Sequence, residues 1–290
     1  MLNALDTVIQ GLLLGGLYAL FATGLSLSFG IMRFVNIAHG DFIVMGAFAS
    51  LAVAVLHPMH PLLSLLVIVP ALAFLGYWAQ RLIYNRTLGD DIMPPLLVTF
   101  GLSVMLQNGL LEIFSGDSRR LDAGELTTAG ITLPGDLSIG VFPLLTLAAA
   151  VALLAGLQFL FARTAIGRSL RATSDDAEIV QLMAVDSRKI YAVAMAIASA
   201  TVALAGVILG MTKAFDPLLG PPQLIFAFEA VIIGGLGSLW GTLAGGMVLG
   251  VAQTVGFRLD PGWGILFGHI AFMAVLLVRP QGLFPKTRDR

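Results

Sequence analysis

Three polar side chains stand close together near the N-terminal end of the chain, in the stretch VNIAHGDF at residues 35–42. An asparagine amide, a histidine imidazole and an aspartate carboxylate can bind a polar solute, relay protons or hydrogen-bond neighbouring helices. The surrounding stretch, 34–56, is otherwise almost wholly apolar. Since a charge facing lipid costs about 2.5–3.5 kcal/mol, we expect Asp41 to face protein or water.

The spacing of these residues prevents one straight helix from directing all three at the same place. At about 100° per residue, Asn36 and His39 share a face, whereas Asp41 points about 200° away from His39. Either the helix breaks at Gly40, or protein surrounds it on every side. Our hypothesis is a broken helix, with these four residues beside a translocation pathway. The alternative is a hydrogen-bond cluster that holds helices together.

Further polar side chains lie inside apolar segments. Thr99, Gln107 and Glu229 join the pathway candidates, although a hydrogen bond between helices is the more frequent role of such groups. Glu229, within LIFAFEAVIIGG, needs a partner, a water-filled cavity or protonation. Lys213 is too far along the sequence to be assumed to be that partner. We expect the remaining polar groups to bridge helices: Asn108, Glu112, Gln253 and His269.

The composition identifies the elements that must position these groups. Of 290 residues, 58% are hydrophobic and 11% are charged, and the mean hydropathy is +0.93. Uncharged runs such as 141–162 and 190–212 are long enough to cross a membrane as helices, and they are continuous rather than alternating as in a barrel strand. We therefore predict an all-α, polytopic transmembrane bundle of about eight to ten spans, forming one domain over 1–290. The absence of cysteine excludes disulfides and thiolate chemistry.

The arrangement of basic residues predicts the topology. We expect spans near 7–29, 34–56, 61–81, 92–114, 139–161 and 190–212, with two or three more between 222 and 279. Loops rich in Lys and Arg stay cytoplasmic. These residues gather at Arg33, at Arg81 and Arg86, in 163–189 and in 279–290. The N-terminus is then periplasmic and the C-terminus cytoplasmic in a bacterial inner membrane. This requires an odd number of spans, nine if 224–278 holds three. The first span, 11–29, lacks the features of a cleaved signal peptide.

Glycines mark close contacts between helices. Several pairs stand four residues apart, a spacing that lets neighbouring backbones approach. The run IIGGLGSLWG at 232–241 predicts a helix break that lines a cavity. The break or packing candidates are Gly234, Gly235, Gly237, Gly241 and Gly245.

The segment 162–189 is the largest connection expected in the cytoplasm, with five basic and four acidic residues. Thr173 and Asp176 fit a capping box, after which Ile179, Leu182 and Met183 share one apolar side. We predict a short amphipathic helix. A helix lying on anionic lipid usually has a basic polar face, whereas this one is acidic, which favours a groove on a partner protein.

Five stretches resemble the permease subunits of branched-chain amino acid ABC transporters. They are GLYALFATGLSLSFGIMRFVNIAHGDFIVMGAF at 16–48, LLVTFGLSVMLQN at 96–108, RTAIGRSLRATSDD at 163–176, VIIGGLGSLWGTLAGG at 231–246 and VRPQGLF at 278–284. They extend over nearly the whole chain. In that family, two membrane subunits pair with two ATPases and a periplasmic substrate-binding protein.

The resemblance also assigns residues. The family's motif of a small residue, His, Gly and an acid is matched by 38–41, whereas Glu229 has no fixed counterpart. Ala184 stands where the family typically has glycine, which leaves the end of the coupling helix open. The ATPase-coupling loop, 162–189, would include Arg163, Thr164, Gly167, Arg168, Arg171, Ala172, Asp175, Asp176, Glu178 and Ala184.

The resemblance implies an ATP-driven importer subunit that translocates branched-chain or other amino acids by alternating access. Urea or short amides are alternative substrates, and a proton-coupled secondary transporter is the alternative from another class. The chain has no phosphate-binding loop for ATP, and no HExxH helix, nucleophile elbow or paired carboxylates, so we expect no enzyme activity, metal or cofactor within it. We expect a homologous second permease, with a homodimer as the alternative, and no nucleic acid.

Overall fold

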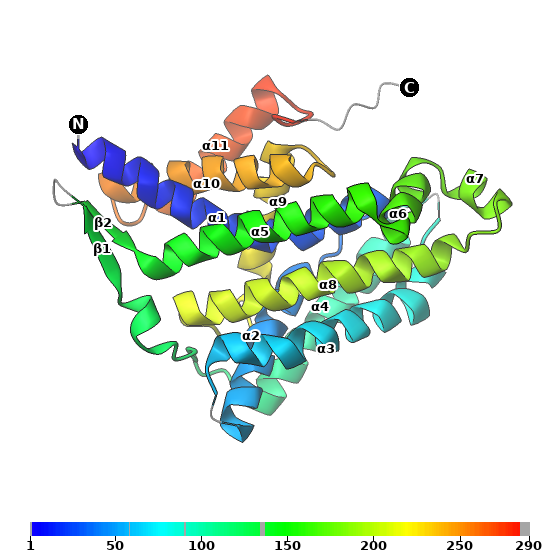
Figure 1. Ribbon diagram of the computed structural model, residues 1–290, viewed down its shortest axis with the longest axis horizontal. Helices are drawn as coiled ribbons and strands as arrows, with labels where there is room; N and C mark the ends of the chain where they lie inside the picture. Colours follow the sequence, from blue (N-terminus) through cyan, green and yellow to red (C-terminus); the bar gives the residue numbers. More distant parts are fainter. Residues whose placement is uncertain (1, 58, 90, 134–136, 285–290) are drawn as a thin grey trace.

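The computed structural model describes residues 2–57, 59–89, 91–133 and 137–284, and over these residues it contains eleven α-helices (Figure 1). Seven are long and apolar enough to cross a membrane. These are α1 (Leu2–Met32), α2 (His39–Leu56), α3 (Pro61–Leu82), α4 (Met93–Phe114), α5 (Val141–Arg163), α8 (Ser187–Thr212) and α10 (Leu239–Leu259). The predicted polytopic helical fold is confirmed.

Two further apolar helices are short: α9 (Gly220–Gly234) and α11 (Gly264–Val278). Fifteen helical residues extend only about 22 Å, less than the roughly 30 Å of the hydrocarbon core. Together with α10 they give three helices in the region where two or three were expected, and nine apolar helices in the described part of the chain.

The connections between helices gather at two opposite ends of the molecule. Figure 1 shows the start of α1 and the hairpin of β1 (Gly130–Leu133) and β2 (Leu137–Gly140) at one end. The Gln10 side chain donates to the carbonyl of Ser138 across 2.8 Å, which ties α1 to the hairpin. The helices α6 (Ala165–Asp175) and α7 (Ala177–Leu182) lie at the other end.

The membrane helices form an inner and an outer group. In α1, 83% of the most apolar stretch is buried within the protein, and in α8 the figure is 72%. The corresponding figures for α3, α4 and α5 are 22%, 17% and 22%. The inner helices therefore hold the core, while the outer helices present apolar faces to lipid or to another protein.

Glycine lets α1 approach α10 closely. A methyl group added to Gly15 would lie 2.5 Å from Met247 Cα, and one added to Gly11 would lie 2.5 Å from Val251 Cα. Any side chain at these positions would therefore force the two helices apart.

The hairpin between α9 and α10 is equally tight. Gly234 ends α9, and the following turn contains Gly235 at φ 105° and Gly237 at φ 76°, which L side chains rarely adopt. Methyl groups at Gly241 and Gly245 would collide with the carbonyls of Gly234 and Ala230. The chain after α11 returns to this turn: the amides of Leu283 and Phe284 donate to the carbonyls of Ile233 (2.8 Å) and Gly234 (3.0 Å).

Candidate functional site

The Asp41 carboxylate lies in the first turn of α2 and is 1% exposed. Its Oδ2 accepts a hydrogen bond from Ser103 Oγ across 2.5 Å, and its Oδ1 accepts one from Gln107 Nε2 across 3.0 Å. Gly220, the first residue of α9, packs so closely that a methyl group there would collide with Oδ1. Two helix N-termini therefore meet at this carboxylate, and both favour its negative charge.

The predicted break at Gly40 is wrong in position. Helix α1 ends at Met32, residues 33–38 are not helical, and α2 begins at His39. Gly40 lies inside the first turn of α2, where a methyl group would collide with the carbonyl of Gly220. Glycine is required here for contact with α9 rather than for a bend. The first part of α2 is surrounded by protein, which was the second of the two arrangements considered.

The other two polar groups of this stretch point elsewhere. His39 is 3% exposed, and its Nε2 lies 2.7 Å from the carbonyl oxygen of Phe21 on α1. Because that oxygen can only accept, Nε2 carries the proton. Asn36 accepts from the amide of Ala38 across 3.1 Å and so shapes the turn before α2. The three side chains therefore bind three different parts of the protein, and a role in a pathway stays a prediction.

The face of α4 toward Asp41 carries a polar side chain at every fourth position. Thr99, Ser103 and Gln107 follow this spacing, which places them on one side of the helix. Thr99 is fully buried and donates to the carbonyl of Leu96 across 3.1 Å. Sequence reasoning missed Ser103, although its spacing from Thr99 and Gln107 was a usable signal.

Glu229 belongs to a second polar cluster, formed by α1, α9, α10 and α11. It is buried, and its Oε1 is bound by Nδ1 of His269, whose side chain is 42% exposed. Nearby, the hydroxyl of Tyr18 donates to Gln253 Oε1 across 2.5 Å. The partner that Glu229 was expected to need is therefore His269.

Lys213, just beyond the end of α8, takes no part in that cluster. Its Nζ donates to Gln223 Oε1 across 3.4 Å. Burial lowers the pKa of the Lys213 ammonium below its ordinary value.

The segment 162–189 folds into two helices rather than one. Thr164 caps α6 by accepting from the amide of Gly167. Asp176 caps α7 by accepting from the amides of Glu178 and Ile179, at 3.0 Å each. The predicted cap at Thr173 is wrong, because Thr173 is buried within α6, and the extended Asp176 between the helices supplies the capping oxygen.

The apolar side predicted for this segment lies on the surface of α7. Ile179, Leu182 and Met183 are 57%, 87% and 75% exposed. Ala184 follows with φ 61°, a left-handed conformation that glycine adopts more readily, which gives a physical reason for glycine at this point in the resembled family.

Two contacts attach α6 to the membrane helices. A methyl group at Gly167 would collide with the carbonyl of Leu160 on α5. Ser174 Oγ donates to the carbonyl of Gly30 at the end of α1 across 2.6 Å. The other candidates of the coupling loop lie exposed on this end of the molecule: Arg163, Arg168, Arg171, Ala172, Asp175, Asp176, Glu178 and Ala184.

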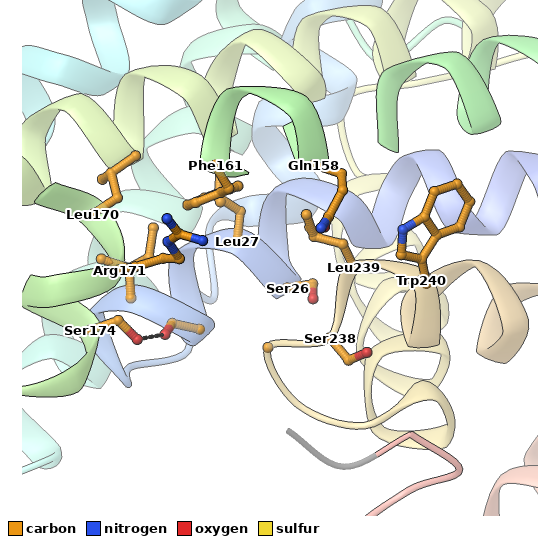
Figure 2. Close-up of a pocket in the computed structure, with 13 residues that line it drawn as sticks. Ser26, Leu27, Gln158, Phe161, Leu170, Arg171, Ser174, Ser238, Leu239 and Trp240 are labelled. Carbon is orange, nitrogen blue, oxygen red and sulfur yellow. Dashed lines mark hydrogen bonds between the residues drawn. The ribbon is translucent and has the colours of Figure 1, made fainter. Parts of the chain in front are cut away.

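A cavity of about 250 Å³ lies between the ends of α1 and α5, the helix α6 and the turn from α9 to α10 (Figure 2). Gly237 of the glycine run lines it, together with Ser26, Gln158, Arg171, Ser238 and Trp240. Among the described residues, no three His, Asp or Glu side chains come together in a way that could hold a metal ion.

Apolar helices packed through glycine, with a short exposed helical insert between two of them, define a multi-pass helical membrane protein. A family model described as the permease component of the branched-chain amino acid transport system matches residues 7–276. The chain belongs to this family and is a multi-pass protein of the inner membrane.

Individual relatives agree with the family. The chain is 31% identical to the high-affinity branched-chain amino acid transport system permease protein BraD of Pseudomonas aeruginosa, over 96% of this chain and 95% of BraD. It is 28% identical to LivH of Escherichia coli, a permease protein of the same description, over 96% and 94% of the two chains. A solved structure of PsaBC from Streptococcus pneumoniae with a Fab is 13% identical, with a TM-score of 0.49 over 95% of this chain and 92% of that one.

Proposed function

We propose that this chain is the permease subunit of an ATP-driven importer and that it moves branched-chain amino acids across the inner membrane by alternating access. The names of BraD and LivH support the substrate class. The chain would need no catalytic residue, metal or cofactor of its own, because ATP would bind to partner subunits.

The main observation in support of this proposal is the exposed apolar side of α7. Leu182 and Met183 are among the most exposed large apolar residues of the protein, yet they lie on the helical insert and not on a membrane helix. Such a surface fits a groove on a partner protein. Because α6 is attached to α5 at Gly167 and to α1 at Ser174, a partner that moves α7 would also move membrane helices.

We assign this surface to the ATPase, with one ATPase for each of two permeases. The tagged chain should co-purify with its ATPases, and Leu182→Asp should lose them while keeping the second permease. Leu182→Met, which preserves the apolar surface, is the matched control. Retention of the ATPases by Leu182→Asp would disprove the assignment. If the chain alone, in vesicles, drove uptake from a proton gradient without ATP, it would be a secondary transporter and the importer proposal would fail.

A second permease would cover the outer face of α4. This helix is mostly exposed, but it carries Asn108 and Glu112 on its exposed side, which are costly in contact with lipid. Gly101 and Gly109 on the same helix have open space beside them, as helices that receive a close neighbour often do. We propose that a homologous permease, or a second copy, packs here, with the pathway between the two subunits.

The lack of cysteine makes this interface easy to test. A photo-cross-linker attached at Gly109→Cys should capture the second permease. The same reagent at Leu66→Cys, on the exposed side of α3, should react only with lipid. Capture from Leu66 and not from Gly109 would place the interface on another face.

The orientation follows from the same proposal. The end with the β1–β2 hairpin would face the periplasm and receive the substrate-binding protein, while α6 and α7 would face the cytoplasm. Uptake of labelled leucine by the reconstituted complex should require ATP and the binding protein. Uptake of urea or short amides in preference to leucine would overturn the substrate class.

A further inference from the structure

The cavity beside α6 has a lining of mixed chemistry. Its lining includes the Arg171 guanidinium and the polar groups of Gln158 and Ser238, together with apolar side chains such as Phe161 and Leu170. Figure 2 shows Arg171 and Trp240 on opposite sides of the same space. A lining of this kind fits a ligand that has both a charged and an apolar part.

The N-terminus of α10 opens into the cavity. Ser238 caps this 21-residue helix by accepting from the amide of Gly241 across 3.1 Å, and Leu239 and Trp240 of its first turn line the cavity. The first amides of a helix have no partner within it, and its dipole is positive at this end. With Arg171 facing it, this helix end favours an anion, and a phosphate group in particular.

A buried hydroxyl group in the cavity lining is a second indication of a ligand, independent of the helix end. Ser26 on α1 is 1% exposed and lines the cavity, and its Oγ has no hydrogen-bond partner among the described residues. A buried hydroxyl without a partner costs about 1–3 kcal/mol. Figure 2 places Ser26 between Arg171 and Ser238, where the hydroxyl can donate to an anion held by those groups.

We propose that this cavity binds the phosphate headgroup of an anionic phospholipid. It lies at the last turns of α5, where that helix leaves its apolar stretch, and Trp240 beside it is 46% exposed, as aromatic side chains at the membrane surface often are. Acyl chains could continue from the cavity along the exposed apolar faces. The headgroup would join α6 to the turn between α9 and α10. Free inorganic phosphate has the same chemistry but would gain nothing from the apolar lining.

Trp240 can report the bound lipid directly. The protein has three tryptophans, so Trp78→Phe with Trp263→Phe leaves Trp240 alone. Vesicles of phosphatidylcholine would contain either brominated phosphatidylglycerol or the same share of brominated phosphatidylcholine. One cationic contact is worth about 1 kcal/mol, so we expect about fivefold enrichment of phosphatidylglycerol beside Trp240, seen as stronger quenching.

Arg171→Gln should abolish this excess quenching, and Ser26→Ala should reduce it. Arg188→Gln, which removes an exposed arginine outside the cavity, should keep it. Equal quenching by the two lipids, or an excess that survives Arg171→Gln, would overturn the proposal. Loss of the excess on addition of inorganic phosphate would assign the site to soluble phosphate instead. Because no ATPase is present in this assay, its outcome is independent of the coupling role proposed for α7.

Discussion

The two buried carboxylates of this protein, Asp41 and Glu229, have very different surroundings. Each oxygen of Asp41 accepts a hydrogen bond from α4, and the start of α9 packs against the group. Glu229 is bound through one oxygen to the half-exposed His269, and its Oε2 has no hydrogen-bond partner among the described residues.

This difference separates a fixed group from one that can change partners. Moving α2 relative to α4 would leave the Asp41 carboxylate and its donors unpaired, which is costly in a membrane interior. Glu229 would lose a single bond if α11 moved. We therefore expect Asp41 to fix the packing of the helices around it, and Glu229 to change its hydrogen-bond partner more readily.

The largest expected effect comes from replacing Asp41 and Glu229 by neutral amide side chains of the same shape. Asp41→Asn offers one acceptor to two donors, so it should lower the free energy of unfolding by about 2–3 kcal/mol. Glu229→Gln keeps an acceptor for His269 and should cost about 1 kcal/mol or less. The effects of both substitutions are measured by thermal unfolding of the purified variants, together with the amount of each variant present in the membrane. If Asp41→Asn unfolded like wild type but lost uptake, Asp41 would belong to the pathway.

A smaller effect tests whether Ser103 acts through Asp41. Ser103→Ala should cost about 1–2 kcal/mol on its own and much less in the Asp41→Asn background, because the two side chains share one bond. Thr99→Ala, one turn away with its hydroxyl bonded to Leu96, is the matched control and should be additive with Asp41→Asn. Unfolding of the double variants gives the coupling energy. An additive Ser103 effect would contradict the role assigned to Asp41.

The smallest effect concerns Lys213, which is bonded to neither acid. Since its pKa is lowered in the folded protein, the unfolded chain binds more protons between that lowered pKa and the ordinary value near 10.4, so stability should rise with pH in this window. Lys213→Met should weaken this rise and slightly raise the melting temperature at lower pH. A lower melting temperature in the variant would mean that the ammonium has an anionic partner after all.

The sequence alone was sufficient to predict the helices that are encoded by long runs of consecutive apolar residues. The runs that became α3, α4 and α8 were placed to within about three residues, because an apolar segment must span the bilayer. Residues separated in sequence were harder to pair. Glu229 clearly needed a partner, but His269 stands 40 residues away on another helix. From the sequence alone, Gly40 suggested a bend. The contact with Gly220 that explains the glycine is visible only in the folded protein.

The contact between the end of the described chain and α9 has a consequence for the order of synthesis. Leu283 and Phe284 bind the carbonyls that end α9, and Gly282 lies so close to Gly235 that a methyl group there would be 2.6 Å from its Cα. A ribosome adds these residues only after it has made the whole of α9, α10 and α11. The turn between α9 and α10 is therefore completed last, and a polypeptide released before Leu283 would leave those carbonyls open at the edge of the bilayer.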